Sequence, residues 1–410
     1  MITCLHVADL HFGVENYGVT NPLTGLHSRL EDFRDSLAQA LDYAIETRVD
    51  CVLFAGDAYK RNSPNPTEQR ELVRQFCRLA DAGIPTVMIS GNHDIPVMQG
   101  KAASIDIFRT IRPGLFHVYI NQPSMKPLIL ETHHGPLAIC ALPYISPSYL
   151  RQVPAFRKLQ GDEFKEAAEG FYKEVIDAMA HAVPEGVPKI LVAHLTAHGA
   201  LLGGYRGSAI MTDEVQILPA NLVNAGYDYI ALGHIHRHQN LSPREEIPVV
   251  YPGSIDRVDF GEAEETKGFV VARIEPKGST YQFIPLPVRP MIPIRVEGEG
   301  DLTTRLLEAI DREPIAGAIV RISFEASDEE MQALDMKQIH AALAPAHFKA
   351  GFLRIHRKPE SRRRAANLSA EIALDEALQT YLREQAEDPE TIPLLMEKAK
   401  LIESAVQSQG

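Results

Sequence analysis

The sequence has few cysteines, no long apolar run and no excess of positive charge. Its 410 residues include four cysteines, and no two of them form a CxxC pair. Cys4, Cys51 and Cys140 lie in apolar strand-like segments and Cys77 lies in a helical one, which favours buried thiols over disulfides or a thiolate metal site. This usage is typical of a reducing compartment, so we expect a cytoplasmic protein.

The absence of a long apolar run bears on membranes. No run is long enough to cross a bilayer, and residues 1–8 are typical of a buried strand rather than of a signal peptide. We therefore expect no membrane partner.

The formal net charge is −13, which argues against a protein that coats nucleic acid through positive charge alone. It does not exclude a nuclease. Bound divalent metals and local clusters of arginine or lysine can attract phosphate while the whole chain stays acidic.

The length predicts two or three domains, and the composition (45% hydrophobic, 23% charged) is that of a globular protein. Up to about residue 275, short apolar runs alternate with helical patterns, which predicts an α/β fold. Many runs are apolar on both faces, as in a sheet covered on both sides. The expected strands are 2–8, 51–55, 85–90, 137–142, 189–193, 229–232, 249–251 and 268–274, and the expected helices are 32–48, 67–82 and 156–182.

A boundary is expected near residues 286–290, where two prolines interrupt the pattern. Beyond it the pattern predicts a small βαβαβ unit, with strands at 292–296, 318–325 and 352–357 and helices at 302–311 and 328–343. Two amphipathic helices, separated by a break at 388–390, are expected near the end of the chain. We therefore divide the chain into residues 1–288, 289–358 and 365–410.

Five polar motifs each directly follow an apolar run. Since an α/β sheet exposes functional side chains at the carboxyl ends of its strands, we expect them to converge. Carboxylate, amide and imidazole ligands suit manganese, iron or zinc. Two ions about 3.5–4 Å apart need a bridging carboxylate and can activate a water between them. Asp57 is the natural bridge, because its segment stands between the other two early motifs. The motifs are Asp9-x-His11, Gly56-Asp57, Gly91-Asn92-His93-Asp94, His194 and Gly233-His234-x-His236.

Each motif alone has a more ordinary interpretation. An Asp-x-His pair is usually incidental, Asn92 can cap a turn, and His194 can be a hydrogen-bonded core histidine. All five in this order, each after an apolar run, favour a metal centre.

This set resembles the calcineurin-like metallophosphoesterase superfamily, whose pattern is DxH, GD, GNH(D), H and GHxH. The resemblance spans residues 9 to 236 and implies a four-layer α/β sandwich with two divalent metal ions. His93 would stand beside the scissile phosphate as a catalytic residue, and Asp94 would hold His93 in the right tautomer. One ion would bind Asp9, His11, Asp57 and His236, and the other would bind Asp57, Asn92, His194 and His234.

Further stretches resemble the SbcD-type nucleases within that superfamily. They are residues 251–262 (YPGSIDRVDFGE), 267–269 (KGF) and 194–196 (HLT), together with the place and size of the 289–358 unit, the family's capping domain. Ala58-Tyr59 departs from the pattern, since a bulkier apolar pair is common there. The resemblance implies a manganese-dependent DNA nuclease with 3′–5′ exonuclease and endonuclease activity. It also implies a homodimer and a coiled-coil ATPase partner of the SbcC type.

Several alternatives stay open. The terminal helices can pack on the chain's own body or dock on the ATPase. The apolar stripe at 37–45 and the helix at 67–82 can each form a dimer surface or belong to the core. Arg61, Arg206, Arg237 and Arg257 can contact phosphates or form local ion pairs. The most basic stretch can belong to a solvated linker or contact phosphate; it comprises Arg354, Arg357, Lys358 and Arg362–Arg364.

Two other functions compete with the nuclease. A small-molecule phosphodiesterase could use the same site, although it would need neither the capping domain nor the tail. A non-catalytic scaffold for the ATPase is the other, although the complete ligand set and His93 argue against it.

Overall fold

The computed structural model describes residues 1–96, 100–112, 114–202, 215–242, 247–276, 278–355, 392–393 and 395–399. By its internal contacts the chain divides into two units. The first comprises residues 1–296, 303–323 and 335–353, and the second comprises 297–302, 324–334 and 354–410. Within the described ranges, no helix combines the length and apolarity needed to span a bilayer.

The first sheet of the first unit has six strands in the order β14-β13-β1-β2-β3-β4. Strands β1 to β4 are mutually parallel, and β13 and β14 add antiparallel at the β1 edge. The bounds are β1 (Ile2–Val7), β2 (Cys51–Phe54), β3 (Thr86–Ile89), β4 (Phe116–Tyr119), β13 (Gly268–Ile274) and β14 (Thr280–Pro285).

The second sheet also has six strands, in the order β11-β12-β10-β7-β6-β5. Its centre, from β12 to β6, is parallel, and antiparallel strands close both edges. The bounds are β5 (Leu128–Thr132), β6 (Gly135–Leu142), β7 (Lys189–His194), β10 (Tyr229–Gly233), β11 (Gln239–Asn240) and β12 (Val249–Tyr251).

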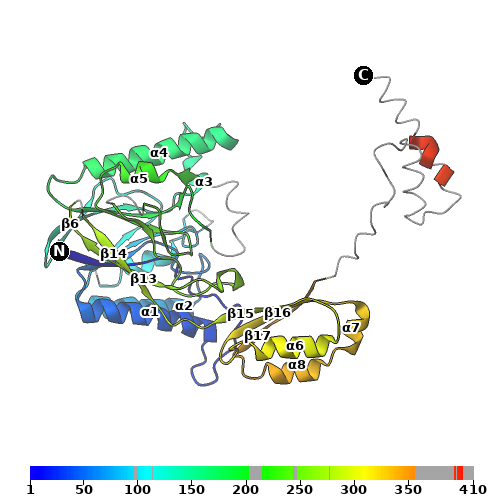
Figure 1. Cartoon of the computed structure of the whole chain (residues 1–410). Coiled ribbons are helices and arrows are strands. Elements are labelled where there is room, and N and C mark those ends of the chain that lie inside the picture. Colours follow the sequence, from blue (N-terminus) through cyan, green and yellow to red (C-terminus); the bar gives the residue numbers. More distant parts are fainter. Residues whose placement is uncertain are drawn as a thin grey trace. The chain divides into compact units, whose positions relative to one another are not determined.

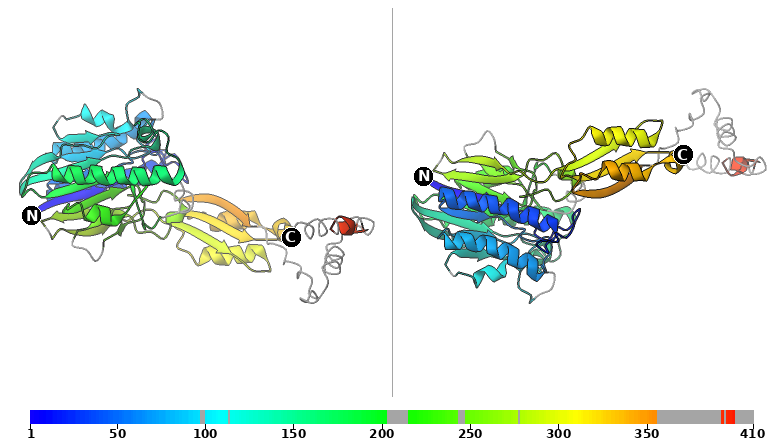
Figure 2. Two further views of the ribbon diagram at one scale, coloured as in Figure 1. Left: turned by 90° about the horizontal axis from the view of Figure 1, so that it is seen from above. Right: turned by 90° about the horizontal axis from the view of Figure 1, so that it is seen from below.

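The two sheets pack face to face and are covered by helices on their outer faces (Figure 1). Cys4 and Leu53 of the first sheet share one buried cluster with Ile190 of the second. Helices α1 (Ser28–Thr47) and α2 (Pro66–Asp81) lie side by side on the first sheet (Figure 2), and α4 (Gly161–His181) and α5 (Pro219–Val223) cover the second. This arrangement confirms the expected four-layer α/β sandwich. The short elements are η1 (Ser104–Arg109), α3 (Pro147–Leu150), β8 (Thr196–Ala197), β9 (Gln216–Ile217) and η4 (Phe260–Glu262).

Local capping sets the helix bounds. Helix α1 begins at Ser28 rather than at residue 32, because the His27 side chain accepts a hydrogen bond from the Arg29 amide. Helix α2 begins with Pro66 behind a capping box. The Asn65 side chain accepts a hydrogen bond from the Glu68 amide, and the Glu68 side chain accepts one from the Asn65 amide.

The expected βαβαβ unit forms a three-stranded sheet in the order β15-β16-β17. Its expected second helix is divided in two, because Leu334 is extended and the Asp335 carboxylate caps a new helix by accepting from the amides of Lys337 and Gln338. Its last strand begins at Phe348 rather than at residue 352. The bounds are β15 (Met291–Val296), α6 (Leu302–Asp311), β16 (Ile319–Glu325), α7 (Asp328–Ala333), α8 (Met336–Ala342) and β17 (Phe348–Ile355).

In the second unit, α7 begins behind a capping box formed by Ser327 and Glu330. Residues 392–393 and 395–399 are helical, within or near the second expected terminal helix. The first expected terminal helix lies outside the described residues, as do the basic stretch 357–364 and most of the glycine-rich segment 197–212. The domain boundaries at 288 and 358 stay predictions.

The buried histidine of β1 should make stability depend on pH. His6 is inaccessible to solvent, and its ring nitrogens lie 3.1 Å from the Tyr229 hydroxyl and 3.2 Å from the Leu232 carbonyl oxygen. Burial lowers the pKa of His6 to about 3. Between its ordinary pKa and that value the unfolded chain binds a proton that the folded chain refuses, so stability falls as pH falls. At about pH 5 the loss is about 2 kcal/mol relative to about pH 7.5.

Urea unfolding of chelator-treated protein at these two pH values would measure the effect. His6→Asn should destabilise the protein at both but reduce the difference between them. The matched control is His133→Asn, at an exposed turn, which should retain the wild-type difference. An unchanged difference in His6→Asn would show that His6 does not contribute.

Candidate metal centre

The five motifs come together from both sheets. Asp9 and His11 follow β1, Asp57 follows β2, and Asn92 and His93 follow β3. From the second sheet, β7 ends at His194 and β10 leads into His234 and His236. The carboxyl ends of the parallel strands thus meet at one edge of the sandwich, as the sequence predicts.

The backbone at this edge adopts conformations that non-glycine residues rarely take. Asp9, His11 and Asp57 have φ of 52°, 44° and 59°. His234 has φ of 104°. Such conformations cost about 1–3 kcal/mol each and persist where the surroundings impose them, which is common at functional sites.

Two motif glycines allow the strand ends to approach closely. A Cβ on Gly56, whose φ is +95°, would meet the Nδ1 of His194. A Cβ on Gly91 would meet the amide and carboxylate of Asp57. Both positions therefore need glycine for the ligand-bearing segments to pack together.

The carboxylate of Asp57 lies at the middle of the cluster. Its Oδ1 accepts a hydrogen bond from the His93 amide at 2.9 Å. Its Oδ2 lies 3.8 Å from His11 Nε2, 3.7 Å from His194 Nε2 and 4.0 Å from His93 Nε2. These separations are too long for hydrogen bonds. The distances to His11 and His194 suit ligand atoms that would each share a cation with Asp57, at about 2.0–2.2 Å from it.

Hydrogen bonds behind the rings determine which nitrogen faces the centre. His194 Nδ1 lies 2.8 Å from the Ala55 carbonyl oxygen and donates to it, so Nε2 carries the lone pair. Burial lowers the pKa of His194 to about 4, which keeps the ring neutral. That Nε2 faces Asn92 Oδ1 at 3.1 Å. Two acceptors then face each other, an arrangement that a cation between them would stabilise.

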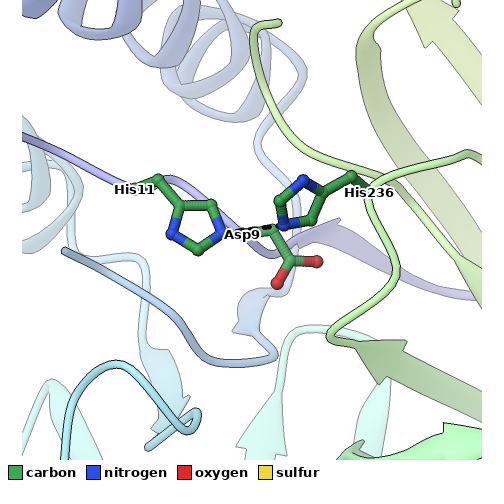
Figure 3. A group of neighbouring side chains, drawn as sticks. All are labelled: Asp9, His11 and His236. Atoms are coloured by element: carbon green, nitrogen blue, oxygen red, sulfur yellow. Dashed lines mark hydrogen bonds between the residues drawn. The ribbon is translucent and has the colours of Figure 1, made fainter. Parts of the chain in front are cut away.

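A second group consists of Asp9, His11 and His236 (Figure 3), which offer ligand atoms within 4.8 Å of one another. The Nε2 atoms of the two histidines are 2.9 Å apart. Both carboxylate oxygens of Asp9 accept from the His234 amide at 3.1 Å. Burial raises the pKa of Asp9 to about 7, and a neighbouring divalent cation would offset that desolvation. The residues present therefore fit a divalent metal.

The remaining expected ligand joins the same cluster. His234 Nδ1 lies 3.1 Å from Asn92 Oδ1, and its ring stands edge-on to that of His194 at 5.1 Å. All seven expected ligands thus lie together, and their assignment to individual ions stays a prediction.

The structure corrects the role expected of Asp94. His93 Nδ1 bonds to the Lys60 carbonyl oxygen at 2.9 Å, so this carbonyl determines its tautomer. The Asp94 carboxylate instead accepts from the amides of Gly91, Asp57 and Ala58 and from the Ser104 hydroxyl, at 2.9–3.3 Å. Its burial, then the nearby Asp57 charge, raises the pKa of Asp94 to about 7. Asp94 therefore positions the backbone of Asp57 rather than the ring of His93.

Glu262 and Lys267 lie beside the centre, although the sequence motifs predict no role for them. Glu262 Oε1 accepts from His236 Nδ1 at 2.7 Å, and its Oε2 lies 2.8 Å from Lys267 Nζ. Burial opposes ionisation of Glu262, but the charge of Lys267 and the bond from His236 hold its pKa well below the usual range. The sequence signal that could have identified both residues is their place in the stretches DFGE (259–262) and KGF (267–269). These stretches resemble the SbcD-type nucleases, but the resemblance assigns no role to either residue.

The candidate arginines differ in whether their side chains are available to contact phosphate. Arg257 donates to three carbonyl oxygens, those of Glu262, Glu265 and Arg289, so it is structural. Arg61 pairs with Glu68, and Arg354 pairs with Asp328. Arg237 is exposed and has no ion pair within the described part of the chain. Arg206 lies outside the described residues.

Comparison with known proteins identifies the relatives of this chain. Residues 2–238 match the family described as calcineurin-like phosphoesterase. The chain is 26% identical to the SbcD component of the nuclease SbcCD from Bacillus subtilis, over 80% of this chain and 82% of that protein.

Two further relatives are aligned over less of their own length. The DNA double-strand break repair protein Mre11 of Methanopyrus kandleri is 25% identical over 80% of this chain. The uncharacterized metallophosphoesterase YhaO of B. subtilis is 25% identical over 69% of this chain. The chain spans 66% of the length of the Mre11 protein and 60% of that of YhaO.

Replacing the buried carboxylate should loosen the centre. Asp94→Asn leaves one acceptor oxygen and turns amide hydrogens toward backbone N–H groups, so we expect a loss of about 1–3 kcal/mol. Manganese affinity should fall as well, because the Asp57 backbone loses its anchor. Urea unfolding without metal and equilibrium manganese binding would measure the two effects. Ser104→Ala, which removes one of the four donors, is the control and should cause a smaller change in both. Wild-type manganese affinity in Asp94→Asn would contradict the positioning role.

Proposed function

The chain belongs to the calcineurin-like phosphoesterase family, and on that premise we propose that it is the DNA nuclease component of an SbcCD-type repair complex. Members of this family are phosphoester hydrolases that bind two divalent metal ions. In this proposal the ions are manganese and the substrate is DNA. The activities are 3′–5′ exonuclease and endonuclease cleavage of phosphodiester bonds. A homodimer, an SbcC-type ATPase partner and a cytoplasmic location belong to the same proposal.

The convergence of Asp57 and the six other candidate ligands is the observation that carries the hydrolase proposal. One ion would be held by Asp9, His11, Asp57 and His236. The other would be held by Asp57, Asn92, His194 and His234. Two bound ions supply an activated water and neutralise charge on the attacking and leaving oxygens.

His93 is the candidate for proton transfer to the substrate. Its side chain is 21% exposed, whereas those of His11 and His194 are inaccessible. The Lys60 carbonyl holds the proton on Nδ1, so any proton exchanged with substrate must pass through Nε2. That nitrogen faces the Asp57 side of the centre, so it can donate to the developing charge or to the leaving oxygen.

The DNA substrate rests on the relatives rather than on the site. Proteins named as the SbcD component of the nuclease SbcCD and as Mre11 align with 80% of this chain, beyond the matched family region. The same ligand set would serve a small-molecule phosphodiesterase, and a scaffold could retain it without turnover. The substrate test therefore has to distinguish all three.

Purified full-length protein with manganese should be given end-labelled duplex DNA, single-stranded DNA and bis-p-nitrophenyl phosphate. We expect cleavage of DNA. His93→Ala should retain both metals but lose most turnover, because only the proton donor is removed. Asp57→Ala should lose metal, because the bridging carboxylate is removed.

Elemental analysis of both variants separates loss of metal from loss of chemistry. Cleavage of the dye ester with DNA untouched, with and without the ATPase partner, would favour the small-molecule enzyme. Lack of cleavage of every substrate by metal-loaded wild type, with partner binding intact, would favour the scaffold.

The ATPase partner gives a separate prediction. Deletion of residues 365–410 should abolish binding to the cognate coiled-coil ATPase, since the apolar stripe of the terminal helices is the proposed docking surface. Dye-ester hydrolysis should persist, because the candidate ligands all precede residue 240. Co-purification of the two chains would measure binding. Retained binding after the deletion would refute this docking surface.

A further inference from the structure

The two groups of candidate ligands differ in what lies behind their histidines. His236 Nδ1 donates to a carboxylate, Glu262 Oε1, at 2.7 Å. His194 Nδ1 donates to a neutral backbone carbonyl, that of Ala55, at 2.8 Å. The first group also contains the carboxylate of Asp9, where the second has the amide of Asn92. The Asp9 group therefore carries more negative charge.

The carboxylate of Glu262 is held rigidly. It is 2% exposed, and its Oε2 accepts from the Val258 amide at 2.9 Å, the Ser254 hydroxyl at 3.3 Å and Lys267 Nζ at 2.8 Å. Lys267 is 1% exposed and also donates to the His236 carbonyl oxygen at 2.9 Å. The bond from Glu262 to His236 is thus fixed by the surrounding loop, and the Lys267 charge stabilises the anion.

This geometry affects the metal-binding nitrogen of the ring. A hydrogen bond from Nδ1 to an anion fixes the tautomer with the lone pair on Nε2 and increases the basicity of that nitrogen. A neutral carbonyl also fixes the tautomer but adds less electron density. Replacement of such partners typically lowers metal affinity about 10- to 100-fold.

We propose that Glu262 is a positioning residue that makes the group of Asp9, His11 and His236 the tighter of two metal sites. The two ions then bind in sequence, first at this group and then at the group of Asn92, His194 and His234. This inference rests on the proposed two-metal centre.

If Glu262 had a purely structural role, its replacement would weaken both metal-binding steps equally. Glu265 provides the matched control. Glu265 Oε2 accepts from the same Lys267 Nζ at 2.7 Å, and it lies three residues along the chain from Glu262. No hydrogen bond within the described residues joins the Glu265 side chain to His236. Glu265→Gln therefore removes a charge beside the lysine but keeps the His236 ring and its hydrogen bond to Glu262.

The test is a calorimetric titration of metal-free, full-length protein with manganese alone. Wild type should bind two ions with distinct affinities. Glu262→Gln should weaken the tighter step about 10- to 100-fold and leave the weaker step unchanged. Glu265→Gln should leave both steps unchanged. In Asn92→Ala, where only the tighter site remains, adding Glu262→Gln should cause the same loss.

Thermal unfolding in chelator separates this effect from misfolding. Every variant used should show a cooperative unfolding transition without metal. If Glu262→Gln does not fold, Glu262→Asp retains the charge for Lys267 while withdrawing it from His236. It should weaken the same step. Equal weakening of both steps, or no weakening, would overturn the inference. Failure of wild type to bind manganese at all would instead overturn the two-metal proposal.

Discussion

The centre depends on the hydrogen bonds that the buried carboxylate of Asp94 accepts. It accepts amide hydrogens from both the β2 and β3 ends, so it joins the segment of Asp57 to that of Asn92 and His93. Burial of a carboxylate is costly unless donors surround it, and here four donors do so. The same contacts fix the direction of the Asp57 side chain, around which the other ligands are arranged.

This anchoring also explains how unusual backbone conformations persist. Asp9, His11, Asp57 and His234 all have positive φ. The amides of Asp9 and His11 donate to carbonyl oxygens of Gly56 and Asp57, and the His234 amide donates to Asp9. Each strained residue is therefore held by a neighbouring ligand segment. The cores on both sides of the sheets offset the cost of this strain.

The sequence predicted the layers and the convergence of the ligands, because hydrophobic runs and the residues that follow them are local features. It could not predict the partners of Asp94, since an Asp next to a His suggests a side-chain pair. The actual donors are backbone amides, one of them 37 residues away. Glu262 could not be predicted for a similar reason, since its bond to His236 joins residues 26 apart, and Glu262 ends the short helix η4, which has no periodic pattern. The division of the 328–343 helix depends on a cap at Asp335 that competes with a continuous apolar pattern.

The charge of the site links metal binding to substrate binding. The chain has a net charge of −13, and Asp9, Asp57, Asp94 and Glu262 lie buried in or beside the centre. Lys267 is engaged by Glu262 and Glu265, and Arg257 by three carbonyls. Without metal, a phosphodiester would therefore approach a cluster of carboxylates beside which Lys267 and Arg257 are already engaged. Two divalent ions held by these ligands would reverse that potential, so metal loading should precede phosphate binding and promote it.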